Sequence, residues 1–148
     1  MKRILLTMII IGLFDILKGQ PNNSDTTIYQ NVEIMPEFIE GDLGFRKYIV
    51  ANFNAPDNNC FVTFIRFTFV VEIDGTISNK EVIINDKHIL LRTGNEDIEI
   101  CKQKWIAAGI TLLNNMPNWI SGKKNNKNVR VKLTTTLNLA PQKDFWNN

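Results

Sequence analysis

The fold of this chain is decided by residues 61–84, which read FVTFIRFTFVVEIDGTISNKEVII. The odd positions from Phe61 to Ile73 are apolar or threonine, whereas the even positions are mixed. A two-residue period in a segment rich in aromatic and β-branched side chains predicts a β-strand. Asp74-Gly75 is a hairpin signal. We therefore expect the chain to turn there and to return as a second strand over residues 76–84.

A third strand is predicted near the end of the chain, where Val129 to Leu139 alternate with polar residues. Two helices are predicted, one before the first strand and one between the second and third strands. Asp42 is the expected cap of the first helix, which runs to about Asn52, and Asn95 is the expected cap of the second, which ends before Pro117. The second helix has an apolar face made of Ile98, Cys101, Trp105, Ala108 and Leu112.

This order of elements predicts an α+β domain, in which a three-stranded antiparallel sheet carries two helices on one face. The helical connection places the third strand beside the first, so the expected spatial order is 2-1-3. The third strand then lies at an edge of the sheet, with unpaired backbone groups and a Lys- and Arg-bearing outer face. Residues 85–94 connect the second strand to the second helix, and Ile89-Leu90-Leu91 are expected to pack against the core.

The first segment of the chain has the composition of an export signal. Lys2 and Arg3 precede an apolar run from Ile4 to Leu17, and the small residue Gly19 follows. We expect cleavage after Gly19 and a periplasmic location, with an uncleaved anchor as the alternative. The expected organisation is a signal peptide over 1–19, a flexible lead-in over 20–34, one domain over 35–140 and a tail over 141–148.

Export makes a disulfide between Cys60 and Cys101 chemically permissible. A bridge requires Cα atoms within about 7 Å, which the sequence does not show. A second interpretation is that Cys101, on the apolar face of its helix, is a small buried hydrophobic residue. Both interpretations remain open at this point.

Composition excludes several classes of function. The 148 residues are 44% hydrophobic, which suits a single globular domain, and the net charge of +2 argues against a nucleic-acid clamp. The one histidine, His88, lies in a connecting segment and is expected to be solvated. The sequence has no nucleophile elbow, no phosphate-binding glycine loop, no CxxC and no HExxH. We therefore expect no enzyme, no metal site and no cofactor.

A basic cluster lies in and before the third predicted strand. It consists of Lys123, Lys124, Lys127, Arg130 and Lys132. These charges have two interpretations: they protect a solvated turn and an edge strand from aggregation, or they attract an acidic partner.

Four short pieces of the sequence, in this order, resemble the TonB C-terminal domain of Bacteroidetes-type proteins. The first two lie around the first helix and comprise MPEF (35–38) with Gly41, and KYI (47–49) with Asn52. The third is the hairpin FVVEIDGTIS (69–78). The fourth comprises MPNW (116–119), Gly122-Lys123 and VRVKL (129–133). Together they span residues 35–139, most of the chain after the signal.

The resemblance implies a role in energy transduction to outer-membrane receptors. Members of the family bind the TonB box, a short extended receptor peptide, by strand addition along the last strand, and work with inner-membrane motor proteins. The residues that this implies for binding are Val129, Arg130, Val131, Lys132, Leu133 and Thr134. Met116, Pro117, Trp119 and Gly122 are expected to support the turn before that strand.

An alternative function is a secreted adaptor or structural module that uses the same edge strand without transmitting force. The short lead-in over 21–34, with Pro21 as its single proline, favours this alternative because the family usually has a long proline-rich tether. Such a module would pair with another envelope protein or with a second copy of itself.

Overall fold

A computed structural model describes residues 26–56, 60–91 and 97–139. Within these ranges the chain forms nine strands, two α-helices and one 3-10 helix. In chain order they are β1 (Ile28–Tyr29), β2 (Glu37–Phe38), α1 (Gly41–Asn52), β3 (Cys60–Val62), β4 (Phe64–Val71), β5 (Ile77–Ile83), η1 (Asp86–His88), β6 (Ile89–Leu91), α2 (Ile98–Asn114), β7 (Trp119–Ile120), β8 (Gly122–Lys124) and β9 (Lys127–Asn138).

The three long strands β4, β5 and β9 lie in the spatial order predicted for them. β4 is central and pairs antiparallel with β5 on one side and with β9 on the other. The pairing with β9 is unbroken from Val71–Val131 to Phe64–Asn138. The pairing with β5 shifts register between Thr68 and Val70, near Asn79, which has a φ of 47°.

The predicted sheet of three antiparallel strands is nevertheless wrong. The main sheet has five strands, because β1 pairs parallel with β9 and β8 pairs antiparallel with the start of β9. Two further two-stranded sheets join β2 to β7 and β3 to β6. The additional strands have only two or three residues each. Such strands are too short to show an alternating pattern, so their pairing depends on which segments meet in the folded chain.

The strand predicted from Phe61 to Ile73 is divided at Thr63. The backbone N–H of Thr63 donates to the carbonyl of His88 over 2.9 Å, and its carbonyl accepts the N–H of Leu139 over 2.7 Å, so the pairing changes from β6 to β9 at this residue. The residues before it form β3, whose partner β6 corresponds to the apolar part of the predicted connection. Ile89 packs into the core as expected, whereas Leu90 and Leu91 are exposed.

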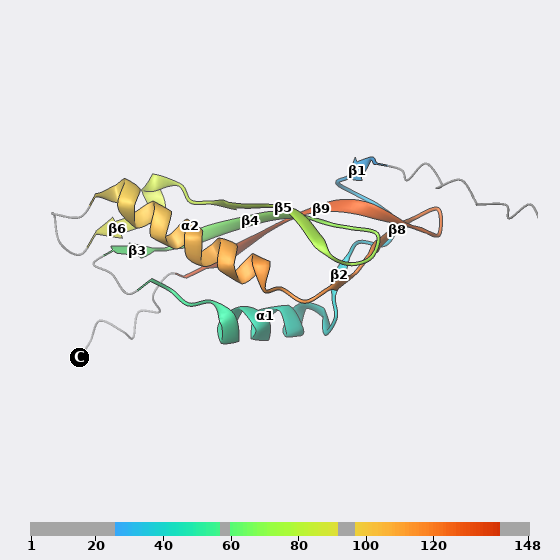
Figure 1. Ribbon diagram of the computed structural model, residues 1–148, viewed down its shortest axis with the longest axis horizontal. Coiled ribbons are helices and arrows are strands. Elements are labelled where there is room, and N and C mark those ends of the chain that lie inside the picture. Colours follow the sequence, from blue (N-terminus) through green and yellow to red (C-terminus); the bar gives the residue numbers. More distant parts are fainter. Residues whose placement is uncertain (1–25, 57–59, 92–96, 140–148) are drawn as a thin grey trace, which may run out of the picture.

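Both helices cover the same face of the main sheet, α2 across the middle of the elongated molecule and α1 beside it (Figure 1). The odd-numbered side chains of β4, including Phe67 and Phe69, are buried in one core with Trp105 of α2 and Ile49 of α1. The Tyr48 hydroxyl ties the helices together by donating to the carbonyl of Leu112 over 2.9 Å. This core leaves the even-numbered side of β4 as the face without helices.

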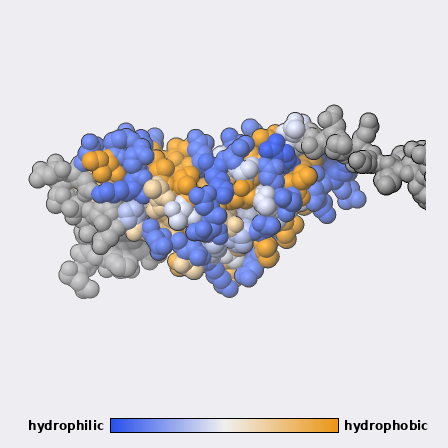
Figure 2. All heavy atoms as spheres, viewed as in Figure 1, coloured by the Kyte–Doolittle hydropathy of each residue, from blue (hydrophilic) through white to orange (hydrophobic). Residues whose placement is uncertain are grey.

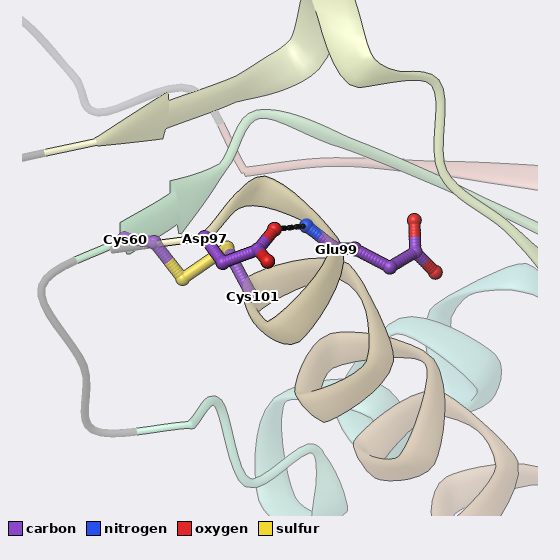
Figure 3. Close-up of a disulfide and its surroundings, with 4 residues drawn as sticks. All are labelled: Cys60, Asp97, Glu99 and Cys101. Atoms are coloured by element: carbon purple, nitrogen blue, oxygen red, sulfur yellow. Dashed lines mark hydrogen bonds between the residues drawn. A yellow bond between two sulfur atoms is a disulfide. The ribbon is translucent and has the colours of Figure 1, made fainter. Parts of the chain in front are cut away.

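The helix starts differ from the expected caps. Asp42 lies inside the first turn of α1, and the residue before the helix, Glu40, makes no side-chain capping hydrogen bond. The cap of α2 is Asp97, whose Oδ1 accepts the N–H of Glu99 over 2.8 Å (Figure 3). The residue predicted for this role, Asn95, lies outside the described residues, as do the predicted signal peptide and tail. None of the helices in the described ranges is long and apolar enough to cross a membrane.

Cys60 and Cys101 form a disulfide, with Cα atoms 6.1 Å apart (Figure 3). The bridge joins β3 to the first turns of α2. The interpretation of a bridge is therefore the one that the structure confirms, and both bonded cysteines are also buried in the core.

The turn between β4 and β5 is held by the segment before β8. Asp74 Oδ1 accepts the N–H and the hydroxyl of Thr76, and Gly75 has a φ of 86°. The carbonyl of Gly75 accepts the N–H of Trp119 over 2.7 Å. A Cβ atom at residue 75 would collide with the carbonyl oxygen of Trp119. Glycine is therefore required both by the backbone conformation and by this close approach.

The disulfide predicts a large effect of reduction on stability. Closing the 41-residue separation should stabilise the fold by about 4 kcal/mol through the entropy of the unfolded chain. We expect dithiothreitol to lower the free energy of unfolding of the natural chain by about this amount in urea denaturation. The Cys60→Ala/Cys101→Ala variant is the control and should not respond to dithiothreitol. Equal curves for the natural chain with and without reductant would contradict the bridge.

The Gly75 contact predicts that Gly75→Ala costs about 2 kcal/mol or more of unfolding free energy, because strain and collision add. Gly75→Asn separates the two causes. Asparagine tolerates a positive φ better than alanine but carries the same Cβ. Stability of the Asn variant close to that of the natural chain would show that the collision with Trp119 is relieved by local movement.

Candidate functional site

The residues predicted to bind a peptide, Val129 to Thr134, all lie on β9, but half of them already pair with one of the short strands β1 and β8. Val129 pairs with Gly122 of β8, and Arg130 and Val131 pair with Ile28 and Tyr29 of β1. The expectation that the whole strand is an open edge is therefore wrong. The reason is that Ile28–Tyr29, within the predicted flexible lead-in, forms an extended stretch that satisfies the backbone of β9.

The outer side of β9 is open beyond Val131: no other strand in the described ranges pairs with it there. Leu139 donates its N–H to the carbonyl of Thr63 over 2.7 Å, which fixes the phase of the β4–β9 ladder. Because hydrogen-bonding direction alternates along a strand, the amides of Val131, Leu133 and Thr135 face β4. Those of Thr134 and Thr136 face outward.

The opposite edge of the sheet is a poorer template for a partner strand. β5 contains Asn79 in the left-handed region, and its register with β4 shifts at that point. Bulges of this kind bend an edge strand and hinder pairing with another chain. The regular ladder of β9 makes its outer side the stronger candidate.

Arg130 is held in an ion pair rather than presented to a partner. Its Nε and Nη2 atoms donate to the two carboxylate oxygens of Glu72 over 2.6 and 2.9 Å, and Nη1 donates to the carbonyl of Thr26 over 2.9 Å. The hydroxyl of Ser78 also donates to Glu72. Hydrogen bonding to Arg130 is the largest cause that lowers the pKa of Glu72, and the same bond raises the pKa of Arg130.

The rest of the basic cluster is divided between a turn and the strand. Lys124 lies over the ring of Tyr29, with its Nζ 4.2 Å from the ring centroid. Asn125 and Asn126, both at positive φ, form the tight turn from β8 to β9. Lys132 is exposed on the same side of β9 as Thr134 and Thr136. The structure therefore does not bring the five cations together as one surface.

The residues predicted as structural support lie in the segment that leads from α2 into β8. Trp119 packs its ring against Phe38, Phe45 and Phe69 and donates its Nε1–H to the sulfur of Met116 over 3.2 Å. Gly122 lies where a Cβ would be 2.7 Å from Val131. Pro117 is exposed between α2 and β7. The packing of Trp119 and Gly122 fixes the path of the chain into β8 and β9.

Sequence reasoning missed the outward half of the edge. Thr136 was not among the predicted residues, although the run of three threonines at 134–136 marks a strand side that is exposed and able to form hydrogen bonds. The Thr134 hydroxyl lies 3.4 Å from that of Thr68, whereas Thr136 lies opposite Arg66.

The face that carries the helices has exposed apolar residues but no metal-binding cluster among the described residues. Figure 2 shows hydrophobic patches interrupted by hydrophilic residues on the face that carries the helices, and the exposed apolar residues of α1 include Leu43 and Val50. Among the described residues, no group of three His, Cys, Asp or Glu side chains could hold a metal ion. His88 lies against the ring of Phe64, with centroids 4.7 Å apart.

The Glu72–Arg130 pair predicts a pH-dependent stability. Because the pKa of Glu72 is lower in the folded state, its contribution is present above the unfolded pKa and is lost as pH falls through the folded pKa. We expect Glu72→Gln to reduce the fall in unfolding free energy between about pH 6 and pH 3 in urea denaturation. In an Arg130→Met background the same substitution should change the pH dependence much less. An equal effect in both backgrounds would show that Arg130 is not the cause.

Comparison of the chain with protein-family models, with curated proteins and with solved structures found no match.

Proposed function

We propose that the chain binds an extended peptide by strand addition on the outer side of β9, between Lys132 and Leu139. From the sequence resemblance we further propose that the peptide is the TonB box of an outer-membrane transporter. In this proposal the chain acts in the periplasm and couples energy from inner-membrane motor proteins to transport. Backbone hydrogen bonds supply affinity in this mode of recognition, and the alternating side chains supply selectivity.

The observation that carries the proposal is the regular, outward-facing backbone of β9 at Thr134 and Thr136. Its pairing with β4 has no register shift, so the strand is straight enough to present successive N–H and C=O groups to a partner. An unpaired edge of this length is a template for another chain unless something covers it.

The pairing of the lead-in strand β1 with β9 supports the same mode of binding. Ile28 and Tyr29 already lie parallel to β9 and pair with Arg130 and Val131. This short strand marks where a bound peptide would have to end or begin. A partner therefore occupies the part of β9 from Lys132 onward, shifted by several residues from the segment predicted from the sequence resemblance.

A second candidate is an adaptor module that uses the edge without transmitting force. It is favoured by the docking of the lead-in, because Ile28 and Tyr29 pair with β9 and Ile34 bridges to Lys123 of β8. A segment held in this way is not a free tether. Retention in the membrane fraction after an alkaline wash supports transduction, whereas a soluble periplasmic pool supports the adaptor.

Titration of the purified chain with TonB-box peptides from the transporters of its own organism tests the proposal. We expect saturable shifts of backbone amide NMR signals that are largest from Lys132 to Leu139. The amide hydrogens of Thr134 and Thr136 should also exchange more slowly with solvent when the peptide is bound. The absence of shifts with every receptor peptide would contradict the transporter as partner.

Proline substitution provides a sharper test of where the peptide lies. Thr136→Pro removes an outward N–H and should lower peptide affinity by about tenfold or more, with little loss of stability at an edge position. Thr136→Val keeps the amide and is the matched control.

Thr135→Pro removes an amide that faces β4 and should cost about 3 kcal/mol of unfolding free energy. Affinity is measured by isothermal titration and stability by urea denaturation. A folded Thr136→Pro variant that binds as tightly as the natural chain would exclude strand addition at this site.

A further inference from the structure

A pocket of about 250 Å³ lies on the face of the main sheet that carries no helix. It is lined by Phe64, Arg66, Asn85, Lys87, His88 and Thr136, with Ile83 completing its wall. The row at its base crosses all three long strands, because Arg66 of β4 pairs with Thr136 of β9 and with Ile83 of β5. The pocket is therefore built on the most regular part of the sheet and is closed at one end by η1.

Two cations in the pocket have no counter-ion among the described residues. Arg66 and Lys87 are exposed, and neither forms an ion pair within the described parts of the chain. This contrasts with Arg130, which is paired with Glu72, and with Lys102, whose Nζ lies 2.9 Å from Asp86. Two like charges at the rim of one pocket repel each other, so their proximity favours an anion between them.

None of the described acidic side chains forms an ion pair with Arg66 or Lys87. Asp86 precedes Lys87 in the chain, but it is bound by Lys102 of α2. Glu72 is engaged by Arg130 and Ser78. Glu81 of β5 lies opposite Thr68 and is the diagonal neighbour of Arg66 on the same face, but it forms no ion pair with Arg66 within the described ranges.

The polar groups around the cations are held in place by their own contacts. Asn85 Oδ1 accepts the backbone N–H of Lys87 over 3.2 Å and so fixes the start of η1. The Nδ1 atom of His88 lies 3.4 Å from the hydroxyl of Thr63, and the ring packs on Phe64. This arrangement leaves Nε2 as the imidazole nitrogen that can meet a ligand.

We propose that this pocket binds an oxyanion group, a carboxylate or a phosphate. The planar guanidinium of Arg66 is suited to hold two oxygen atoms of such a group, and the ammonium of Lys87 adds a second positive charge. The Thr136 hydroxyl and the His88 ring supply further hydrogen bonds. The proposal concerns a second site and does not depend on peptide binding at β9.

The anion has two possible sources, because Thr136 belongs to both the pocket and the open edge. A strand added outside β9 would place a side chain about 5 Å from that of Thr136 on the same face. An acidic side chain at that point could extend toward Arg66, one strand further in. The other source is a free small carboxylate or phosphate that enters the pocket from solvent.

Titration of the purified chain with sodium phosphate and with sodium succinate tests the site, with sodium chloride at equal ionic strength as the reference. We expect saturable shifts of the His88 ring and Arg66 side-chain NMR signals with at least one of the two anions. Arg66→Gln and Lys87→Gln should each weaken the binding by about fivefold or more. Arg46→Gln, which removes an exposed cation of α1, is the matched control and should leave the affinity unchanged.

Two sets of receptor peptides distinguish the two sources of the anion. One set carries Glu at each position in turn, and the other carries Gln at the same positions. A Glu peptide that binds about fivefold more tightly than its Gln partner, with the difference lost in Arg66→Gln, identifies the peptide side chain as the ligand. If phosphate or succinate binds and the Glu and Gln peptides have equal affinities, the ligand is a free small anion.

The proposal is overturned if neither anion gives saturable shifts and no Glu peptide is preferred. Shifts that are unchanged in both Arg66→Gln and Lys87→Gln would also overturn it. If no peptide binds at all, the proposed function fails while the phosphate and succinate titrations still decide the pocket. Because Arg66 and Lys87 are exposed, unchanged urea denaturation of the two variants should show that they remain folded.

Discussion

The antiparallel pairing of β4 with β9 is the constraint on which the rest of the structure depends. It joins the middle of the chain to its end along an unbroken ladder from Val71–Val131 to Phe64–Asn138. This long-range pairing closes a large loop, so the apolar burial on the helix-bearing face must offset its entropy. Both β8 and β1 pair with β9 and so depend on its position. The open edge and the proposed anion pocket both follow from the same ladder.

Two further long-range connections hold the parts that this ladder does not reach. At one end the Cys60–Cys101 bridge fixes β3 to α2, and at the other the Gly75 carbonyl binds the backbone of Trp119. Figure 1 shows β3 and β6 at one end of the molecule and β8 at the opposite end. The aromatic packing of Trp119 then links the approach to β8 with α1 and the core. β9 is consequently supported along its length, while from Lys132 to Leu137 no strand of the described ranges pairs with its outer side.

The edge and the pocket combine into one surface at Thr136. Its amide faces outward from β9, whereas its side chain faces the same way as Arg66, on the face without helices. A partner that supplies both an extended backbone and an acidic side chain would satisfy both features at once. A partner with only one of them would use half of the surface.

The sequence by itself determined the long elements. The two-residue period predicted long strands where β4, β5 and β9 lie, and the helical connection predicted their spatial order. The apolar face of Cys101, Trp105 and Leu112 predicted α2, because local patterns record which side of an element is buried. Only the tertiary structure decided the disulfide, the short strands and the cover of Val129 to Val131 by β8 and β1. These depend on proximity between distant segments, which no local pattern carries. The same holds for the outward direction of the Thr136 amide and for the grouping of Arg66, Lys87 and His88, since both depend on strand register.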